Sequence, residues 1–341
     1  MRIGLVGYGF GGRRFHAPLI AALVGVSFTG VVTRSRARRS ELADDLGAAA
    51  PPALDSVTEL IAGGVDLVSV SIPPEARGPV VRELLDAGVA VVSDKPFAST
   101  LDEGIALAEY AAARDVPLTV FHNRRWDSEA LTLARAVEDG LVGEVRGCDS
   151  NLERWEPWAA ERSSGGGHLL DVGSHLVDQL REVFGPVSRV LAVIDRASGL
   201  PLETGYLLVL EHRSGLRTRV TASCTQAAEY PRFRLTGSEG TLVLDGLDVQ
   251  TEHTLAGLSP RDSAWGVEPP DRAGVLHRTD GTRAAVSRER GDWSAFYRGT
   301  IDALRDGSTL PVPIAGAIST LAVLEAAVES DRTGEWVAPR A

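Results

Sequence analysis

The stretch GLVGYGFGGRRFH, residues 4–16, decides the fold. Gly7, Gly9 and Gly12 form a G-x-G-x-x-G pattern between the first apolar run and the first helical pattern, where this motif binds a dinucleotide. Gly7 permits a tight turn, Gly9 lets the backbone approach a pyrophosphate, and Gly12 lets the helix pack closely on the strand. The helix N-terminus then offers free N–H groups to the phosphates. The alternative is a plain glycine turn in another α/β fold.

Apolar runs and helical patterns alternate through the first third of the chain. The runs lie at 2–6, 28–32, 66–71, 89–92 and 118–121, and the helical patterns at 12–24, 35–46, 56–61, 75–87 and 100–114. Continuous Val, Ile and Leu runs separated by helices are typical of parallel strands that are buried on both faces and joined by right-handed crossovers. The pattern predicts a doubly wound parallel sheet, a Rossmann domain over residues 1–122.

The pattern changes after residue 122. We expect helices at 128–140 and from the glycines at 165–167 to 184, then strands at 190–194, 206–212, 216–223, 232–236, 241–244 and 247–250, with hairpin turns at 213–215 and 237–240. Residues 253–290 are expected to form loops with at most a strand or two, and helices at 293–305 and 314–330 close the chain. The fold class is therefore α/β, with a second, α+β domain over 123–341 whose large open sheet is mostly antiparallel.

The composition is that of an ordinary globular protein, with 44% hydrophobic and 24% charged residues. A net charge of −11 argues against nucleic acid or an anionic membrane as a partner. Cys148 and Cys224 form no CxxC motif. The paired Arg13 and Arg14 before an apolar run resemble an export signal, but an apolar segment precedes them, so we expect a cytoplasmic protein. An open sheet face needs cover, which predicts a homodimer or homotetramer through the C-terminal sheet.

The end of the second predicted strand bears on the choice of cofactor. NAD sites usually place an acid there for the ribose 2′-OH, but VVTRSRARR, residues 31–39, contains none. Arg34, with Ser35 and Arg36 or Arg38, favours the 2′-phosphate of NADP over NAD. The alternative is a solvated helix start, to which Arg39 belongs. Over residues 7–71 the predicted cofactor-binding residues are Gly7, Gly9, Phe10, Gly11, Gly12, Thr33, Arg34, Ser35, Arg38 and Ser71.

Lys95, in VVSDKPFA at 91–98, is the only lysine of the chain. An ammonium is compact and its pKa falls on burial, whereas a guanidinium stays charged everywhere. A site that shares a proton needs Lys where Arg would fail. The alternative is a leftover surface lysine in an arginine-rich composition.

The stretch GGGHLLDVGSHLVDQ, residues 165–179, places His168, Asp171 and His175 at i, i+3 and i+7 of a helix, on one face. Three interpretations stay open. The residues are buried structural groups, or ligands of a metal ion. In the third, Asp171 orients His175 for proton transfer.

Four motifs in order, GYGFGGRRFHAPL, DKP, FHNRRWD and GGGHLLDVGSHLVDQ, resemble the Gfo/Idh/MocA oxidoreductases, as does the segment 291–313. The likeness is greatest to the branch of NADP-dependent scyllo-inositol dehydrogenases. It implies that Lys95, Asp171 and His175 surround the substrate carbinol and the nicotinamide. It also implies that Asn123, Ile72, Pro73 and Lys95 contact the cofactor. Two positions depart from the family pattern, Asp94 for the usual Glu and Arg77 for the usual His.

We therefore expect an NAD(P)-dependent dehydrogenase or reductase that transfers a hydride between nicotinamide and a secondary alcohol or ketone. The resemblance implies a polyol, inositol or sugar substrate. His175 would be the acid/base held by Asp171, and Lys95 would stabilise the alkoxide. Substrate-pocket candidates are His122, Arg154, Trp155, Trp158 and His168, for which a packed aromatic corner is the alternative. The rival functions are a non-catalytic dinucleotide sensor and a metal-dependent hydrolase, although we expect no metal.

Overall fold

The computed structural model describes residues 1–161 and 167–340. The chain forms two compact units. The first unit comprises Met1–His122, Thr251–Trp265 and Trp293–Ile318, and the second comprises Asn123–Gln250, Gly266–Asp292 and the chain from Ser319 onward. The division of the sequence into domains at residue 122 stays a proposal, since two later segments pack with the N-terminal part.

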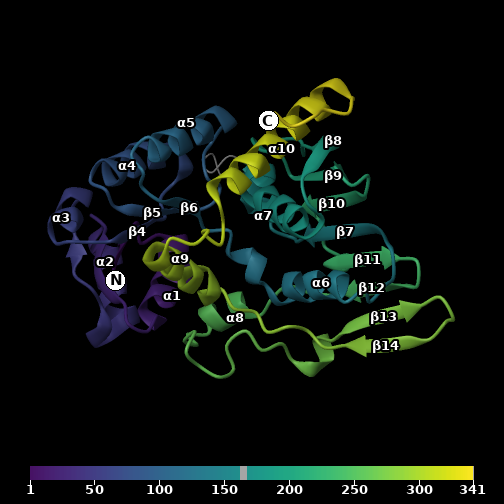
Figure 1. Ribbon diagram of the computed structural model, residues 1–341, viewed down its shortest axis with the longest axis horizontal. Coiled ribbons are helices and arrows are strands. Elements are labelled where there is room, and N and C mark those ends of the chain that lie inside the picture. Colours follow the sequence, from purple (N-terminus) through teal and green to yellow (C-terminus); the bar gives the residue numbers. More distant parts are fainter. Residues whose placement is uncertain (162–166, 341) are drawn as a thin grey trace. The chain divides into compact units, whose positions relative to one another are not determined.

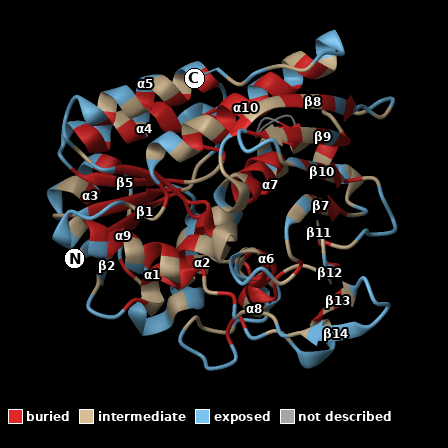
Figure 2. Cartoon of the chain, turned by 45° about the vertical axis from the view of Figure 1, so that its right-hand side comes forward, coloured by how far each residue is buried: buried red, intermediate tan, exposed pale blue. Residues whose placement is uncertain are grey.

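The first unit contains the predicted parallel sheet, with strand order β3-β2-β1-β4-β5-β6 (Figure 1). Its strands are β1 (Arg2–Val6), β2 (Ser27–Val32), β3 (Ala53–Leu54), β4 (Leu67–Val70), β5 (Ala90–Ser93) and β6 (Leu118–Val120). All neighbouring pairs are parallel, and β4, β5 and β6 are buried along their whole length; Figure 2 shows β5 in red. The doubly wound fold is confirmed. Strand β3 was not predicted because two residues give no apolar run.

Side-chain caps explain where several helices of this unit begin. The unit contains α1 (Ala17–Ala22), α2 (Arg36–Leu46), α3 (Val57–Ala62), α4 (Pro74–Asp86), α5 (Leu101–Ala112) and α9 (Ser294–Asp306). Ser35, Ser56 and Thr100 each accept a hydrogen bond from the backbone N–H three residues on, which satisfies a donor that the helix start leaves free. The first predicted helix is divided, because a π-helical turn, Gly12–His16, precedes α1.

Helix α9 supplies an aromatic core to the first unit. Phe296 and Tyr297 are fully buried and pack on Phe121 with ring centroids 5.0 and 5.6 Å away. Trp293 packs edge-on against Phe15 at 5.6 Å. The late segment 293–306 thereby becomes part of the unit that carries the glycine loop.

The second unit contains an eight-stranded sheet of order β14-β13-β12-β11-β7-β10-β9-β8. Its strands are β7 (Val145–Glu153), β8 (Val187–Asp195), β9 (Gly205–His212), β10 (Arg217–Ser223), β11 (Phe233–Gly237), β12 (Gly240–Leu244), β13 (Gly274–Arg278) and β14 (Arg283–Val286). Every pair is antiparallel except β7 and β10. Helices α6 (Ser128–Glu138) and α7 (Gly167–Phe184) pack on it, and α10 (Ile314–Thr333) ends the helical part of the chain. The mostly antiparallel α+β unit is confirmed.

Two predictions for this unit are wrong. Strand β7 was missed because its inward residues include Cys148 and Ser150, so the sequence VRGCDSNLE lacks an apolar alternation. The predicted strand at 247–250 does not form. There Asp248 accepts a hydrogen bond from Gln250 N at 2.6 Å, and the chain turns into α8 (Gln250–Leu255).

Candidate functional site

The glycine loop after β1 has a geometry that only glycine permits at two positions. Gly7 has a φ of 96°, and a Cβ there would overlap the carbonyl oxygen of Ser71. A Cβ on Gly12 would overlap the carbonyl oxygen of Gly7. Gly9 differs, since the nearest atoms to its Cβ position belong to the Arg38 side chain at 3.7 Å or more. The loop is therefore tight on its protein side and open at Gly9, which fits a backbone cradle for a pyrophosphate.

Hydrogen bonds to Asp45 connect this loop and the π-helical turn to α2. The Tyr8 ring is buried against Leu5 and Val31, and its hydroxyl donates to Asp45 at 3.0 Å. Arg13 donates to both oxygens of Asp45, at 2.6 and 2.9 Å. Burial and the neighbouring Asp45 raise the pKa of Tyr8, so the phenol remains a donor. Sequence reasoning missed this contact because it joins positions 32 to 37 residues apart.

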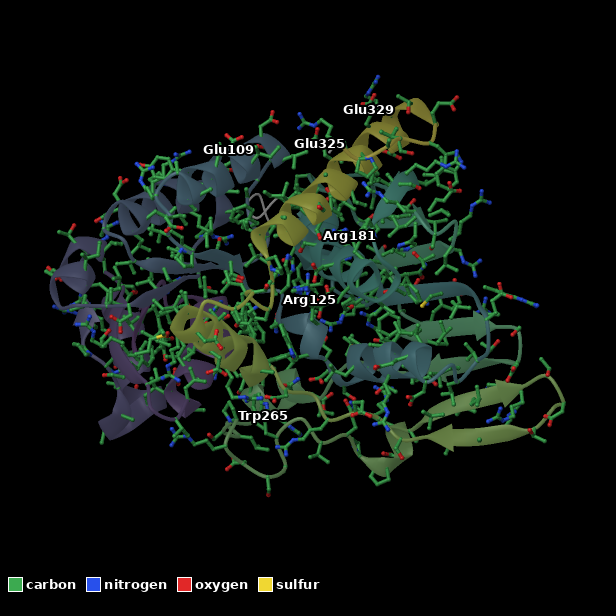
Figure 3. All side chains as sticks on the ribbon, in the orientation of Figure 1. Glu109, Arg125, Arg181, Trp265, Glu325 and Glu329 are labelled. Carbon is green, nitrogen blue, oxygen red and sulfur yellow. The ribbon has the colours of Figure 1, made fainter. Side chains whose placement is uncertain are left out.

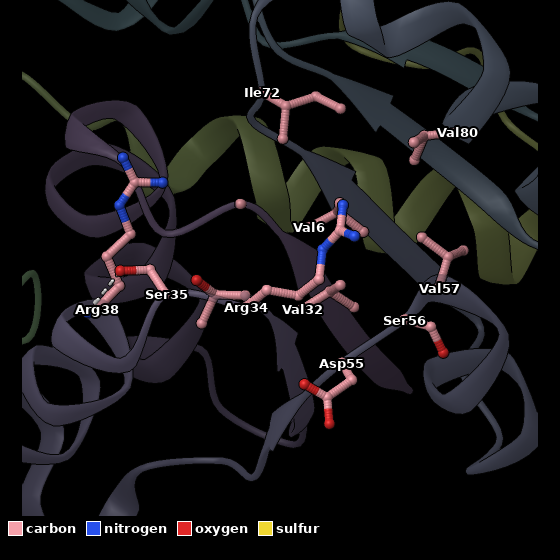
Figure 4. Close-up of a pocket in the computed structure, with 12 residues that line it drawn as sticks. Val6, Val32, Arg34, Ser35, Arg38, Asp55, Ser56, Val57, Ile72 and Val80 are labelled. Atoms are coloured by element: carbon pink, nitrogen blue, oxygen red, sulfur yellow. Dashed lines mark hydrogen bonds between the residues drawn. The ribbon is translucent and has the colours of Figure 1, made fainter.

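A cavity of about 510 Å³ lies beside the loop (Figure 4). Its lining consists of Val6, Gly7, Val32, Thr33, Arg34, Ser35, Arg38, Asp55, Ser56, Val57, Ile72 and Val80. Six of these belong to the predicted cofactor set: Gly7, Thr33, Arg34, Ser35, Arg38 and Ile72. The cavity lies at the carboxyl ends of parallel strands, where doubly wound sheets bind their ligands.

The cavity contains two arginines and one aspartate, and in the described ranges only the aspartate side chain is paired. Arg34 and Arg38 are exposed, and within the described part of the chain neither guanidinium forms a hydrogen bond or an ion pair. Asp55 also lines the cavity, but it pairs with Arg39, whose Nε donates to the Thr33 carbonyl at 2.9 Å. The cavity thus holds two arginines whose guanidinium groups have no partner among the described residues and one acid that pairs with Arg39. Asp55 was missed because it follows β3, the strand that sequence reasoning did not find.

The loops after β4 and β5 meet at Asp94. Ser71 Oγ donates to Asp94 Oδ2 at 2.6 Å, and Lys95 N donates to Asp94 Oδ1 at 2.8 Å. Arg77 is buried, and its guanidinium donates to the carbonyls of Ile72, Asp94 and Pro96. Arginine at the family's histidine position therefore joins both loops. Ser71, Ile72 and Lys95 lie on these loops, and Pro73 directly precedes α4.

Helix α7 carries the predicted acid/base residues. Asp171 is exposed, whereas His175 retains only 7% of its accessible surface, and His168 is half-buried. Burial lowers the pKa of His168, so this imidazole is neutral over most of the physiological range. No group of three or more His, Cys, Asp or Glu side chains in residues 1–161 and 167–340 is arranged to hold a metal ion. The described residues therefore offer no candidate metal centre.

Asn123 is held against α7 by its neighbours. It begins the 3-10 helix Asn123–Trp126, in which Arg125 donates to both oxygens of Asp178 at 2.7 and 2.8 Å. Gln179 Nε2 donates to the Arg124 carbonyl at 2.5 Å. Arg125 and Arg181 are labelled in Figure 3. Arg125 donates to Asp178, and Arg181 donates to the Thr320 hydroxyl at 3.0 Å. Asn123, Asp171 and His175 thus belong to the second unit, whereas the glycine loop and Lys95 belong to the first.

The substrate candidates are spread over both units. His122 is buried after β6 in the first unit. In the second unit, Arg154 lies 3.8 Å from Glu156, and burial lowers the pKa of its guanidinium. The side chains of Trp155 and Trp158 are 60% and 50% exposed, which does not fit the alternative of a packed aromatic corner.

Tyr230, which the sequence analysis does not name, contacts the segment of these candidates. It is 68% exposed, and its N–H donates to Glu153 Oε2 at 3.0 Å. The segments 153–156 and 224–230 run side by side, since Trp155 bridges Thr225. The exposed aromatic residues of this region therefore come from two chain segments. The missed strand β7, which leads into the first of them, hid this arrangement.

None of the helices in the described ranges is long and apolar enough to cross a membrane.

Comparisons with known proteins cover nearly the whole chain. The family model described as an oxidoreductase family with an NAD-binding Rossmann fold matches residues 1–122, and its C-terminal alpha/beta domain matches 134–338. The uncharacterized oxidoreductase YdgJ of Escherichia coli K12 is 32% identical over 97% of this chain and 96% of its own. The scyllo-inositol 2-dehydrogenase (NADP(+)) IolW of Bacillus subtilis is 28% identical over 97% and 94%. A crystal structure of a candidate oxidoreductase from Klebsiella pneumoniae superposes with a TM-score of 0.91 at 31% identity, over 100% of this chain and 95% of that one.

Proposed function

Because the chain belongs to the Gfo/Idh/MocA oxidoreductase family, we propose that it is an NADP-dependent dehydrogenase or reductase of a polyol, inositol or sugar. The observation that carries the choice of NADP is the cavity in which Arg34 and Arg38 have no acidic partner among the described residues. The relative IolW, a scyllo-inositol 2-dehydrogenase (NADP(+)), supports the same proposal.

The two arginines suit a phosphate ester better than a ribose hydroxyl. A guanidinium makes charge-assisted, forked hydrogen bonds to phosphate oxygens. Ser35 caps α2 at the same place, so its helix start adds N–H donors and a positive partial charge. The rival acceptor for an NAD ribose is Asp55, whose Oδ1 already accepts from Arg39.

When bound, the nicotinamide supplies the hydride chemistry. The protein must then move one proton at the carbinol oxygen. In our proposal His175 takes that proton during oxidation and returns it during reduction, while Asp171 holds the imidazole in one tautomer. Lys95 donates a hydrogen bond to the same oxygen and stabilises the charge that develops there.

The second candidate function, a dinucleotide sensor without turnover, needs the cavity but no proton-transfer residues. Retention of Lys95, Asp171 and His175 favours the enzyme. Turnover with NADP⁺ in a screen of inositols, sugar alcohols and aldoses, followed at the nicotinamide absorbance, separates the two. Cofactor binding without any turnover across the screen would favour the sensor.

We also propose that the chain forms a homodimer or homotetramer through the second sheet. Val193 on β8 and Leu207 on β9 are 57% and 42% exposed on the face of the sheet opposite to their buried neighbours. Exposed apolar side chains on one sheet face are typical of a contact between subunits. Light scattering coupled to gel filtration tests this, and a monomeric mass at micromolar concentration would contradict it.

The variants Arg34→Ala and Arg38→Ala test the cofactor proposal, with Arg36→Ala as the matched control, because Arg36 is exposed but does not line the cavity. Each cavity variant should weaken NADPH binding about tenfold and leave NADH binding within about twofold. The effect should shrink at high salt, since the arginines are exposed. Equal loss for both cofactors, or a loss in Arg36→Ala as large as in Arg34→Ala, would contradict the phosphate role.

A further inference from the structure

A series of buried polar groups lies behind the loop that carries Lys95. His16, on the π-helical turn, has no accessible surface, and its Nδ1 lies 2.6 Å from the Tyr297 hydroxyl. That hydroxyl lies 2.8 Å from Ser69 Oγ on β4. On the other side of the ring, His16 Nε2 lies 3.4 Å from Asp94 Oδ2. All of these residues belong to the first unit, and the dehydrogenase chemistry proposed above gives them no role.

The Asp94 carboxylate connects this series to three segments of the cofactor site. It accepts hydrogen bonds from Lys95 N and from Ser71 Oγ, at 2.8 and 2.6 Å. It also adjoins the glycine loop, because a Cβ on Gly11 would come within 3.0 Å of Asp94 Oδ2. One side chain therefore sets the relative positions of the glycine loop, the loop after β4 and the backbone of Lys95.

Two nitrogen-bearing side chains face Asp94. Arg77 approaches from α4, and His16 approaches from the π-helical turn. Burial alone would raise the pKa of Asp94, but His16 and Arg77 hold it well below its ordinary range. Because Arg77 donates its hydrogen bonds to carbonyl oxygens, His16 is the side chain that faces Oδ2 beside Ser71. Without that neighbour the buried carboxylate would lose one of the groups that lower its pKa.

We propose that His16 is a positioning residue for Lys95 and acts through Asp94. Tyr297 and Ser69 hold the imidazole, the imidazole holds Asp94 Oδ2, and Asp94 Oδ1 fixes the backbone N–H from which the Lys95 side chain projects. The inference rests on the proposed function, in which Lys95 bonds the carbinol oxygen. In this proposal the buried residues position Lys95 and do not themselves transfer a proton in the reaction.

A matched pair of variants separates the two nitrogens of His16. The amide nitrogen of Asn can take the place of Nδ1, so His16→Asn keeps a partner for Tyr297 and loses the nitrogen that faces Asp94. The amide nitrogen of Gln can take the place of Nε2, so His16→Gln keeps a nitrogen that faces Asp94. Both variants place one neutral amide in the same buried site, so a merely structural role predicts similar effects for both.

Lys95 can be observed directly because it supplies the only ε-amine of the chain. Its rate of acetylation by acetic anhydride, followed by peptide mass spectrometry with the α-amine as internal reference, reports its placement without any substrate. We expect labelling of Lys95 at least about threefold faster in His16→Asn and within about twofold of wild type in His16→Gln. Equal rates in the two variants, or wild-type rates in both, would overturn the proposal.

Asp94→Asn keeps the inference testable if His16→Asn does not fold. It has the shape of Asp94 but no charge, and it should also speed labelling at least about threefold. A wild-type rate in Asp94→Asn would overturn the proposal as well. The assay is independent of turnover. If Lys95→Met is inactive but His16→Asn does not speed the labelling of Lys95, only this inference is rejected. If Lys95→Met is active, only the catalytic assignment of Lys95 is rejected.

Discussion

Alanine at Gly9 and alanine at Gly12 should have opposite effects on stability. The Cβ of Gly9→Ala would meet only the flexible Arg38 side chain at 3.7 Å, and the φ of Gly9 is not in the left-handed region. A glycine replaced by alanine at a compatible site gains roughly 0.4–1 kcal/mol of stability. The Cβ of Gly12→Ala would overlap the Gly7 carbonyl, and overpacking of this kind costs about 1–3 kcal/mol.

The effect on cofactor binding should not follow stability. Gly9 lies at the open side of the loop, where a pyrophosphate would approach the backbone, so its new methyl group should weaken NADPH binding at least about tenfold, or about 1.4 kcal/mol. Gly63→Ala is the matched control, because its φ is −69° and its Cβ would lie 3.5 Å from the nearest atoms, away from the cavity.

The assay combines thermal unfolding with fluorescence titration of NADPH for the three variants. We expect Gly9→Ala to melt at or slightly above the wild-type temperature and yet bind NADPH poorly, and Gly63→Ala to bind normally. Wild-type NADPH affinity in Gly9→Ala would refute the assignment of this loop as the pyrophosphate cradle.

Two further predictions concern Lys95 and the buried acids of the second unit. Lys95→Met should leave NADPH affinity within about threefold and lower kcat at least about a hundredfold, since it removes a donor to the reacting oxygen. Stopped-flow turnover with a substrate from the screen checks this, and near-normal kcat would contradict the assignment of Lys95. Burial, and then the charge of Asp127, raise the pKa of Glu129 to about 7, so the folded chain holds a proton that the unfolded chain releases, and stability should fall as pH rises from about 4.5 to 7. Glu129→Gln should reduce that slope, measured by urea denaturation across pH, while Asp248, whose pKa burial raises to about 8, keeps the rest of it. An unchanged slope would show that Glu129 does not contribute to it.

The first unit was largely predictable because its strands are continuous apolar runs. Strand β1 has the expected limits, and β2, β4, β5 and β6 differ from expectation by one residue at one or both ends. Such runs reflect burial on both faces, which local sequence records. Strand β7 was missed since its inward side chains are small or polar, and the segment at 247–250 looked like a strand although Asp248 makes it a capped turn.

The candidate site also contains residues that local sequence patterns reveal and contacts that they do not. The glycines, Arg34 and Ser35 could be found because they act next to their neighbours in sequence. The Tyr8–Asp45 contact and the approach of Tyr297 to His16 could not, because they join positions 37 and 281 residues apart, and Asp55 could not, because it follows a strand too short to detect. Local pattern therefore identified the motifs, whereas the contacts that hold them required the fold.

The central claim is tested most directly by titrating the wild-type protein with NADPH and NADH in parallel and following the fluorescence of each reduced nicotinamide. Two exposed arginines without acidic partners in the described cavity predict that NADPH binds at least about tenfold more tightly at low salt. Equal or tighter binding of NADH would contradict the phosphate role of Arg34 and Arg38, and binding of neither would contradict the proposed function itself.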